Sequence, residues 1–203
     1  TDGAPHLALR GTIAGAREHF AGVDPCVVRV HGEQFTSTLV ERDGELRVPL
    51  GVVPTHDAVV GLSTLARAVG GEFVSEHLKA IVAAGGAKGE PVPTTAVTAR
   101  LGLRAELTPL LDPCVLGEGD TLPVRLSLDL ADAAGVALSV SYSPRADAEP
   151  DRVEVRTRAG GFADIAIRGA GEHVVSALAV VGRLDGAREH VSVSLAFATG
   201  GRR

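Results

Sequence analysis

The chain has 203 residues, of which 45% are hydrophobic and 22% are charged, a composition typical of a globular protein and not of a disordered one. Its formal net charge is −5 and only 3% of its residues are aromatic, whereas nucleic-acid binding depends on positive surfaces and aromatic platforms, so we expect no nucleic-acid partner. No stretch reaches the roughly 18 uninterrupted apolar residues of a membrane span, and we expect no membrane insertion.

The first part of the chain has the composition of short strands separated by turns. Four segments are rich in Val, Leu and Thr and are bounded by Gly, Asp or Pro, namely HLALRGTIAG (6–15), CVVRVHG (26–32), QFTSTLVE (34–41) and ELRVPLGVV (45–53). The RDG between the last two segments predicts a tight turn.

The next part, 55–86, changes to a helical period. Apolar residues recur at intervals of three or four, at Val59, Leu62, Ala66 and Val69, and again at Val74, Leu78, Ile81 and Val82. This spacing predicts two short helices. Thr55 or Asp57 would cap the first helix, and the pair Gly85-Gly86 would end the second.

Pro91 and Pro93 indicate a linker, because proline lacks a backbone donor and favours extended neighbours. We therefore expect a mixed domain over 1–90, in which the strands precede the two helices, a linker over 91–95, and a second domain over 96–203. The alternative is one continuous β fold in which the helical pair is an insertion.

The second domain carries the clearest pattern in the chain. Leu122, Val124, Leu126, Leu128 and Leu130 alternate with polar residues, and the alternation resumes from Val136 to Tyr142, which predicts a β-hairpin. Further strands are expected within 96–107, 151–158, 161–169, 172–181 and 188–199. About seven strands in a segment of this size predict an immunoglobulin-like β-sandwich. The fold class is therefore mainly β, or α+β overall, and it implies no function by itself.

The two cysteines, Cys26 and Cys114, each follow Asp-Pro and precede an apolar run. They are either two separate buried thiols or a disulfide that joins the two halves. Finger-type zinc is excluded because neither cysteine has a Cys-x-x-Cys partner. The location is undetermined, and we favour an extracytoplasmic or particle-associated one, where a disulfide would persist.

Seven histidines are present without His-x-His or His-x-x-x-His spacing, so a metal site needs histidines from different strands to converge. His173 and His190 are the candidate metal ligands. His56 and Asp57, with Ser63 further along, suggest a hydrolase, but no Gly-x-Ser-x-Gly elbow is present. We assign no catalytic residue and no cofactor. The preferred function is a non-enzymatic binding or assembly module that contacts a protein partner, or copies of itself, through sandwich edges and loops. Histidine-based metal handling and a hydrolase remain the alternatives.

Overall fold

The computed structural model describes residues 6–9, 26–30, 33–38, 40–42, 45–49, 58–82, 95–145, 148–182 and 186–200. Within these residues the protein is mainly β, as predicted, and its one α-helix is the single turn α2 (Thr95–Thr98). None of the described segments forms a helix that is long and apolar enough to cross a membrane.

The predicted N-terminal strands are present as five short elements. They are β1 (His6–Leu9), β2 (Cys26–Val30), β3 (Glu33–Ser37), β4 (Val40–Arg42) and β5 (Glu45–Pro49). Strands β1, β5 and β4 form a small antiparallel sheet in that order. Strands β2 and β3 instead join the edge of a much larger sheet.

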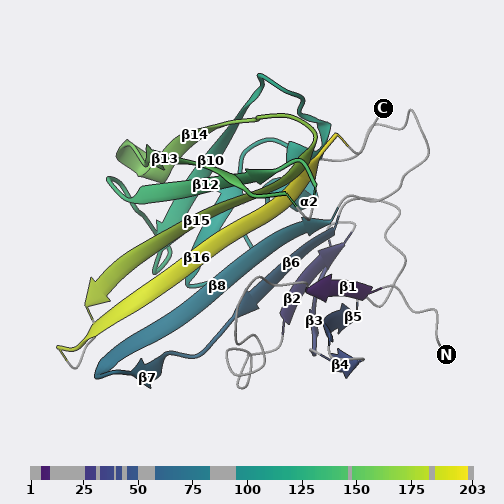
Figure 1. Ribbon diagram of the computed structural model, residues 1–203. Helices are drawn as coiled ribbons and strands as arrows, with labels where there is room; N and C mark the ends of the chain where they lie inside the picture. The colour runs from purple at the N-terminus through teal and green to yellow at the C-terminus, as the bar shows by residue number, and fades with distance from the viewer. Residues whose placement is uncertain are drawn as a thin grey trace.

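This larger sheet, the long sheet, organises the molecule (Figure 1). Its order is β13-β12-β15-β16-β8-β6-β2-β3, and β7 (Arg67–Val69) pairs with one end of β8. The remaining strands are β6 (Ala58–Ser63), β8 (Glu72–Val82), β12 (Ala137–Ser143), β13 (Asp151–Arg156), β15 (Gly171–Gly182) and β16 (Arg188–Thr199). Only β8 and β16 run parallel among its described pairs, so a strand from the first half of the chain lies beside the last strand.

A second sheet covers one face of the long sheet. It contains β9 (Ala105–Pro109), β10 (Thr121–Leu128), β11 (Ala131–Asp132) and β14 (Phe162–Ala166), and the short 3-10 turns η1 (Pro113–Val115) and η2 (Ala159–Gly161) adjoin it. Alternate residues of both sheets form one core, which includes Leu107, Leu126, Leu138, Val193 and Leu195. Each such buried side chain stabilises the fold by about 1.5–3 kcal/mol, which accounts for a sandwich-like arrangement of two sheets.

The predicted hairpin over 122–142 is wrong in its pairing, although both of its strands are present. Strand β10 pairs with β9, β11 and β14, whereas β12 pairs with β13 and β15 in the long sheet. The connection turns at Asp129 and Leu130, both with positive φ, and the chain then crosses from one sheet to the other. Alternation alone predicts that both strands bury one face, but it does not identify the sheet to which each belongs.

The two predicted helices are also wrong, because the described residues of this segment form β6, β7 and β8. Strand β6 is buried on both faces, so its apolar residues are continuous and do not alternate. Strand β8 alternates in burial, but polar Ser75, His77 and Lys79 occupy its buried positions. The apolar residues Val74 and Leu78 therefore take the less buried positions of β8, which is the reverse of the usual strand pattern. Residues 55–57 and 85–86, which were to cap the helices, lie outside the described residues.

The long sheet contains strands from both sides of the expected linker over 91–95, since β6 and β8 precede it and β12 to β16 follow it. The division into domains 1–90 and 96–203 stays a prediction.

Candidate functional site

A row of polar side chains lies on the inner face of the long sheet, the face that carries Val191, Val193 and Leu195. Strand register places Ser75 beside Val191, His77 beside Val193 and Lys79 beside Leu195. All three β8 side chains are at most 4% exposed. Buried polar groups need hydrogen-bond partners, so we expect each of these three side chains to contact another polar group.

His77 lies against Ser63, which occupies the paired position on β6. The Ser63 Oγ and the His77 Nδ1 are 2.8 Å apart, whereas the His77 Nε2 is buried and has no hydrogen-bond partner. Burial lowers the pKa of His77, and the nearby Arg104 charge lowers it further against the opposing effect of Glu189 and Asp129. The ring is therefore neutral near pH 7 and offers one donor and one acceptor.

Arg104 connects the inner face to the segment that precedes β9. Its Nη1 donates to Glu189 Oε1 at 2.6 Å, and its Nε donates to Asp129 Oδ1 at 2.6 Å. Ser75 Oγ donates to the same Glu189 oxygen at 2.5 Å. These hydrogen bonds raise the pKa of Arg104 well above its usual range, so the guanidinium stays charged. We call Ser63, Ser75, His77, Arg104, Asp129 and Glu189 the polar cluster.

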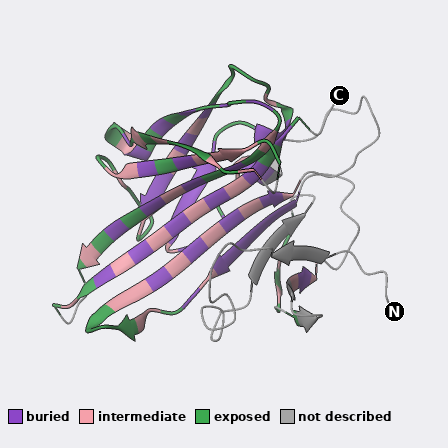
Figure 2. Cartoon of the chain, viewed as in Figure 1, coloured by how far each residue is buried: buried purple, intermediate pink, exposed green. Residues whose placement is uncertain are grey.

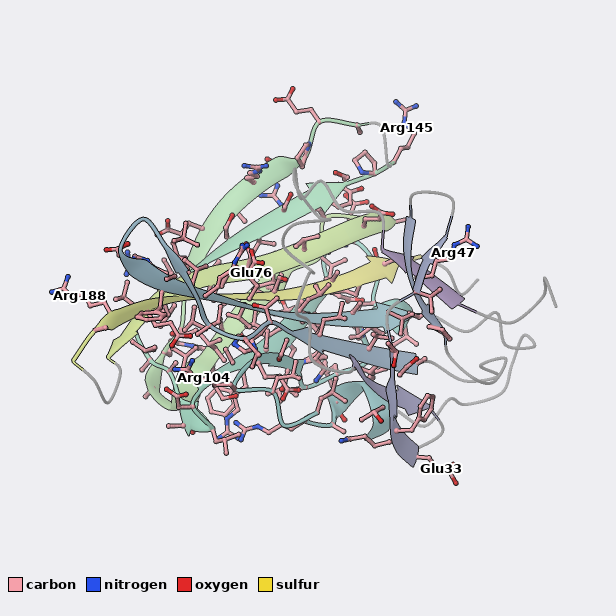
Figure 3. The ribbon with its side chains drawn as sticks, turned by 90° about the horizontal axis from the view of Figure 1, so that it is seen from below. Glu33, Arg47, Glu76, Arg104, Arg145 and Arg188 are labelled. Carbon is pink, nitrogen blue, oxygen red and sulfur yellow. The ribbon has the colours of Figure 1, made fainter. Side chains whose placement is uncertain are left out.

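The polar cluster borders a cavity of about 360 Å³, which Ser63, Ser75, His77 and Arg104 line together with residues 64–66 and Gly102. This volume lies at the lower end of the range of small-molecule pockets. Figure 3 labels Arg104 and also Glu76, which follows Ser75 on β8 and therefore points to the opposite face of the sheet.

A buried ion pair holds the Arg104 segment against β8. The Lys79 Nζ lies 2.7 Å from Glu106 Oε1, and both side chains are 1% exposed. Lys79 also donates to the Ala99 carbonyl at 2.7 Å, while Glu106 accepts from the backbone N–H groups of Leu101 and Gly102. The pair thus fixes residues 99–106 and with them one wall of the cavity.

The other face of the long sheet, the outer face, carries exposed apolar side chains. On β15, Leu178 is 65% exposed, Val180 is 56% exposed and Val174 is 39% exposed, and all three point to this face. Ser192 lies beside Leu178 on β16, and Ala196 lies beside Val174. Burial alternates along β16 and β8 in Figure 2, and the residues on the outer face are only partly buried.

The chain matches one family model over residues 27–181, which is more than half of its length, and that family is described as "Domain of unknown function (DUF4198)". The chain belongs to this family. The comparison with curated proteins gave no match. A solved structure titled "Crystal structure of chicken CNTN1 FN1-FN3 domains" is 12% identical to this DUF4198 member, with a TM-score of 0.23. The match covers 86% of this chain and 57% of the chicken chain, and at this TM-score it carries no argument.

In this DUF4198 chain the predicted metal ligands, His173 and His190, do not come together. His173 is fully buried on the inner face between the rings of Tyr142 and Phe197. His190 points to the outer face, where its Nε2 lies 2.7 Å from Glu72 Oε2 without hydrogen-bond geometry. The two are opposite Phe197 and Val180 respectively, which separates them by about 23 Å along the ladder. Among the described residues, no group of three or more His, Cys, Asp or Glu side chains is placed to hold a metal ion.

The other predicted sites are only partly described. Cys114 is buried in η1, where its backbone N–H donates to Asp112, and Cys26 begins β2. The side chain of Cys26 lies outside the described residues, so the disulfide stays a prediction. His56 and Asp57 also lie outside them, and the imidazole that Ser63 meets is that of His77.

No sequence pattern indicated Arg104 or Glu189 or gave His77 a role, although all three belong to the polar cluster. The cluster draws on β6, β8, β16 and the segment before β9, so no local spacing could indicate it. One signal was available, since a serine, a histidine and a lysine alternate along 75–79 of a strand.

Proposed function

We propose that this protein is a non-enzymatic binding module, and that the outer face of the long sheet joins it to a second copy of the chain. The observation that carries this proposal is the row of Leu178, Val180 and Val174, which are 65%, 56% and 39% exposed on one side of one strand. Apolar patches of this kind on a sheet mark contact surfaces, because their exposure to water is unfavourable.

The strand order supports an immunoglobulin-like sandwich as the scaffold. After α2, and apart from the two-residue β11, the strands in chain order are β9, β10, β12, β13, β14, β15 and β16, with β10 beside β9 and β14, and β15 between β12 and β16. Immunoglobulin-like folds place their B strand beside A and E, and their F strand between C and G.

The outer face of the long sheet is a better surface for contact with a second copy than the sheet edge at β13. Asp151, Arg152, Glu154 and Arg156 make β13 a charged strand, which discourages the addition of another strand. We therefore place the contact on the outer face and not on the edges and loops that the sequence suggested.

A second copy fits the charge pattern of the outer face. The whole chain carries a net charge of −5, so two copies repel each other at long range. On the outer face, however, Glu76 lies 4.0 Å from Arg67, and Glu72 lies beside His190. Because these carboxylates have basic neighbours, two copies of this face can approach without a strong local repulsion.

Sedimentation velocity over a range of protein concentrations tests the proposal. We expect a reversible dimer that Leu178→Lys weakens. Burying one leucine stabilises an interface by about 1.5–3 kcal/mol, and a symmetric dimer loses two, so the dissociation constant should rise by a factor of roughly 100 or more.

Leu130→Lys is the matched control, because Leu130 is 66% exposed but lies in the turn after β10. We expect this variant to dimerise like the wild type. A monomer at concentrations of about 100 µM, or equal effects of the two substitutions, would overturn the proposal.

A further inference from the structure

We infer that the cavity beside the polar cluster is a binding site for a small uncharged molecule that carries an amide or hydroxyl group. The site lies on the inner face and is independent of the contact proposed for the outer face. Three features support it: an unpartnered ring nitrogen, ionic groups that are already paired, and a suitable volume.

The first feature is the Nε2 atom of His77. The side chain is 4% exposed and lines the cavity, and this nitrogen has no hydrogen-bond partner. A buried polar atom without a partner destabilises a fold, because it has lost its hydrogen bond to water. A ligand that supplies the missing partner recovers this free energy, which makes the atom a natural contact point.

The second feature is the state of the charges around the ring. Arg104 is held by Glu189 and Asp129, and Ser75 donates to Glu189 as well. One guanidinium thus faces two carboxylates, so an anionic ligand would meet excess negative charge. A cationic ligand would have to compete with Arg104 for carboxylates that it already holds at 2.6 Å. An uncharged ligand avoids both penalties.

The Ser63 hydroxyl determines what the ring offers to a ligand. If Ser63 donates to Nδ1, then Nε2 carries the proton and is a donor; if Nδ1–H donates to Ser63, then Nε2 is an acceptor. A primary amide or an alcohol contains both a donor and an acceptor and fits either tautomer. The volume of about 360 Å³ limits the ligand to a small molecule.

The same geometry argues against a nucleophilic role for Ser63. Burial and Arg104 lower the pKa of His77, which makes the ring a weak base. The Nε2 atom also lacks the carboxylate that orients the imidazole in a catalytic triad. A binding site requires neither basicity nor an orienting carboxylate.

Nuclear magnetic resonance of histidine ring nitrogens tests the inference. The probe is acetamide, compared with sodium acetate and methylammonium chloride at the same ionic strength. We expect acetamide to shift the His77 Nε2 resonance in a saturable manner, with little response to the two ions. No saturable shift with acetamide, or a larger shift with acetate, would overturn the inference.

Two variants distinguish the cavity from the rest of the surface. Ala66 lines the cavity, so Ala66→Phe should abolish the acetamide shift without altering His77 itself. Ala166→Phe adds the same ring at an exposed position of β14 and should leave the shift unchanged. Leu178→Lys should also leave it unchanged, so failure of the dimer and failure of the cavity site are separable. A shift that survives in Ala66→Phe would contradict the location of the site.

Discussion

Lys79→Met tests how strongly the buried ion pair holds the wall of the cavity. The substitution keeps most of the side-chain volume but leaves the Glu106 carboxylate 1% exposed and without its cation. Removing one partner of a buried pair lowers the free energy of unfolding by about 3–5 kcal/mol. Glu106 retains the N–H groups of Leu101 and Gly102, so we expect a loss near the lower end of that range, about 3 kcal/mol.

Urea denaturation followed by circular dichroism measures this loss, and a thermal scan should show a fall in Tm of roughly 6–12 °C for a chain of this size. In the double variant Lys79→Met/Glu106→Gln the uncompensated charge is also removed, so we expect it to be more stable than Lys79→Met alone. Arg158→Met is the control, because Arg158 also lies 2.7 Å from a carboxylate, that of Asp164, but the two side chains are 65% and 51% exposed. If Lys79→Met loses less than about 1 kcal/mol, or no more than Arg158→Met, the reasoning is refuted.

Three further predictions concern the fold and its dependence on pH. Gly161 has a φ of +73°, and an added Cβ would overlap the Leu126 carbonyl oxygen, whereas Gly102 has a φ of +80° and nothing within 4 Å. Gly161→Ala should therefore lose several times the roughly 1 kcal/mol expected for Gly102→Ala, and equal losses in urea would contradict this. Leu195→Ala should lose about 2–5 kcal/mol, because Leu195 is fully buried, and a loss under about 1 kcal/mol would place it outside the core. Burial lowers the pKa of His173, with only partial opposition from the Gly171 backbone. The unfolded chain then binds the proton more readily, and stability falls as the pH drops below about 6.5, by at most about 1.4 kcal/mol per pH unit. His173→Phe should flatten part of the fall in Tm between about pH 7 and pH 5, and an unchanged slope would refute this account.

Strands β10 and β16 were predictable because most of their inward positions hold Val, Leu or Phe. Leu122, Val124 and Leu126 on β10 are each fully buried, and the row from Val191 to Phe197 on β16 is at most 4% exposed. In these strands the hydrophobic period and the burial period coincide, so sequence alone reveals the fold class.

Strand β8 was not predictable because its hydrophobic and burial periods differ. Ser75, His77 and Lys79 point inward, and each has a partner there, in Glu189, Ser63 and Glu106 respectively. Those partners lie in other segments of the chain, so nothing near β8 in the sequence indicates that polar residues are buried there. The candidate site was missed for the same reason, since its residues converge only through long-range pairing.

The parallel pairing of β8 with β16 has a consequence for the order of folding. Phe73 pairs with Glu189 and Ala80 pairs with Ala196, so one edge of β8 acquires its neighbour only after more than 100 further residues have been synthesised. Long-range parallel contacts form late because a large loop must close first. On a translating ribosome the backbone donors and acceptors along that edge of β8 therefore stay open to other nascent chains until β16 emerges and pairs with them.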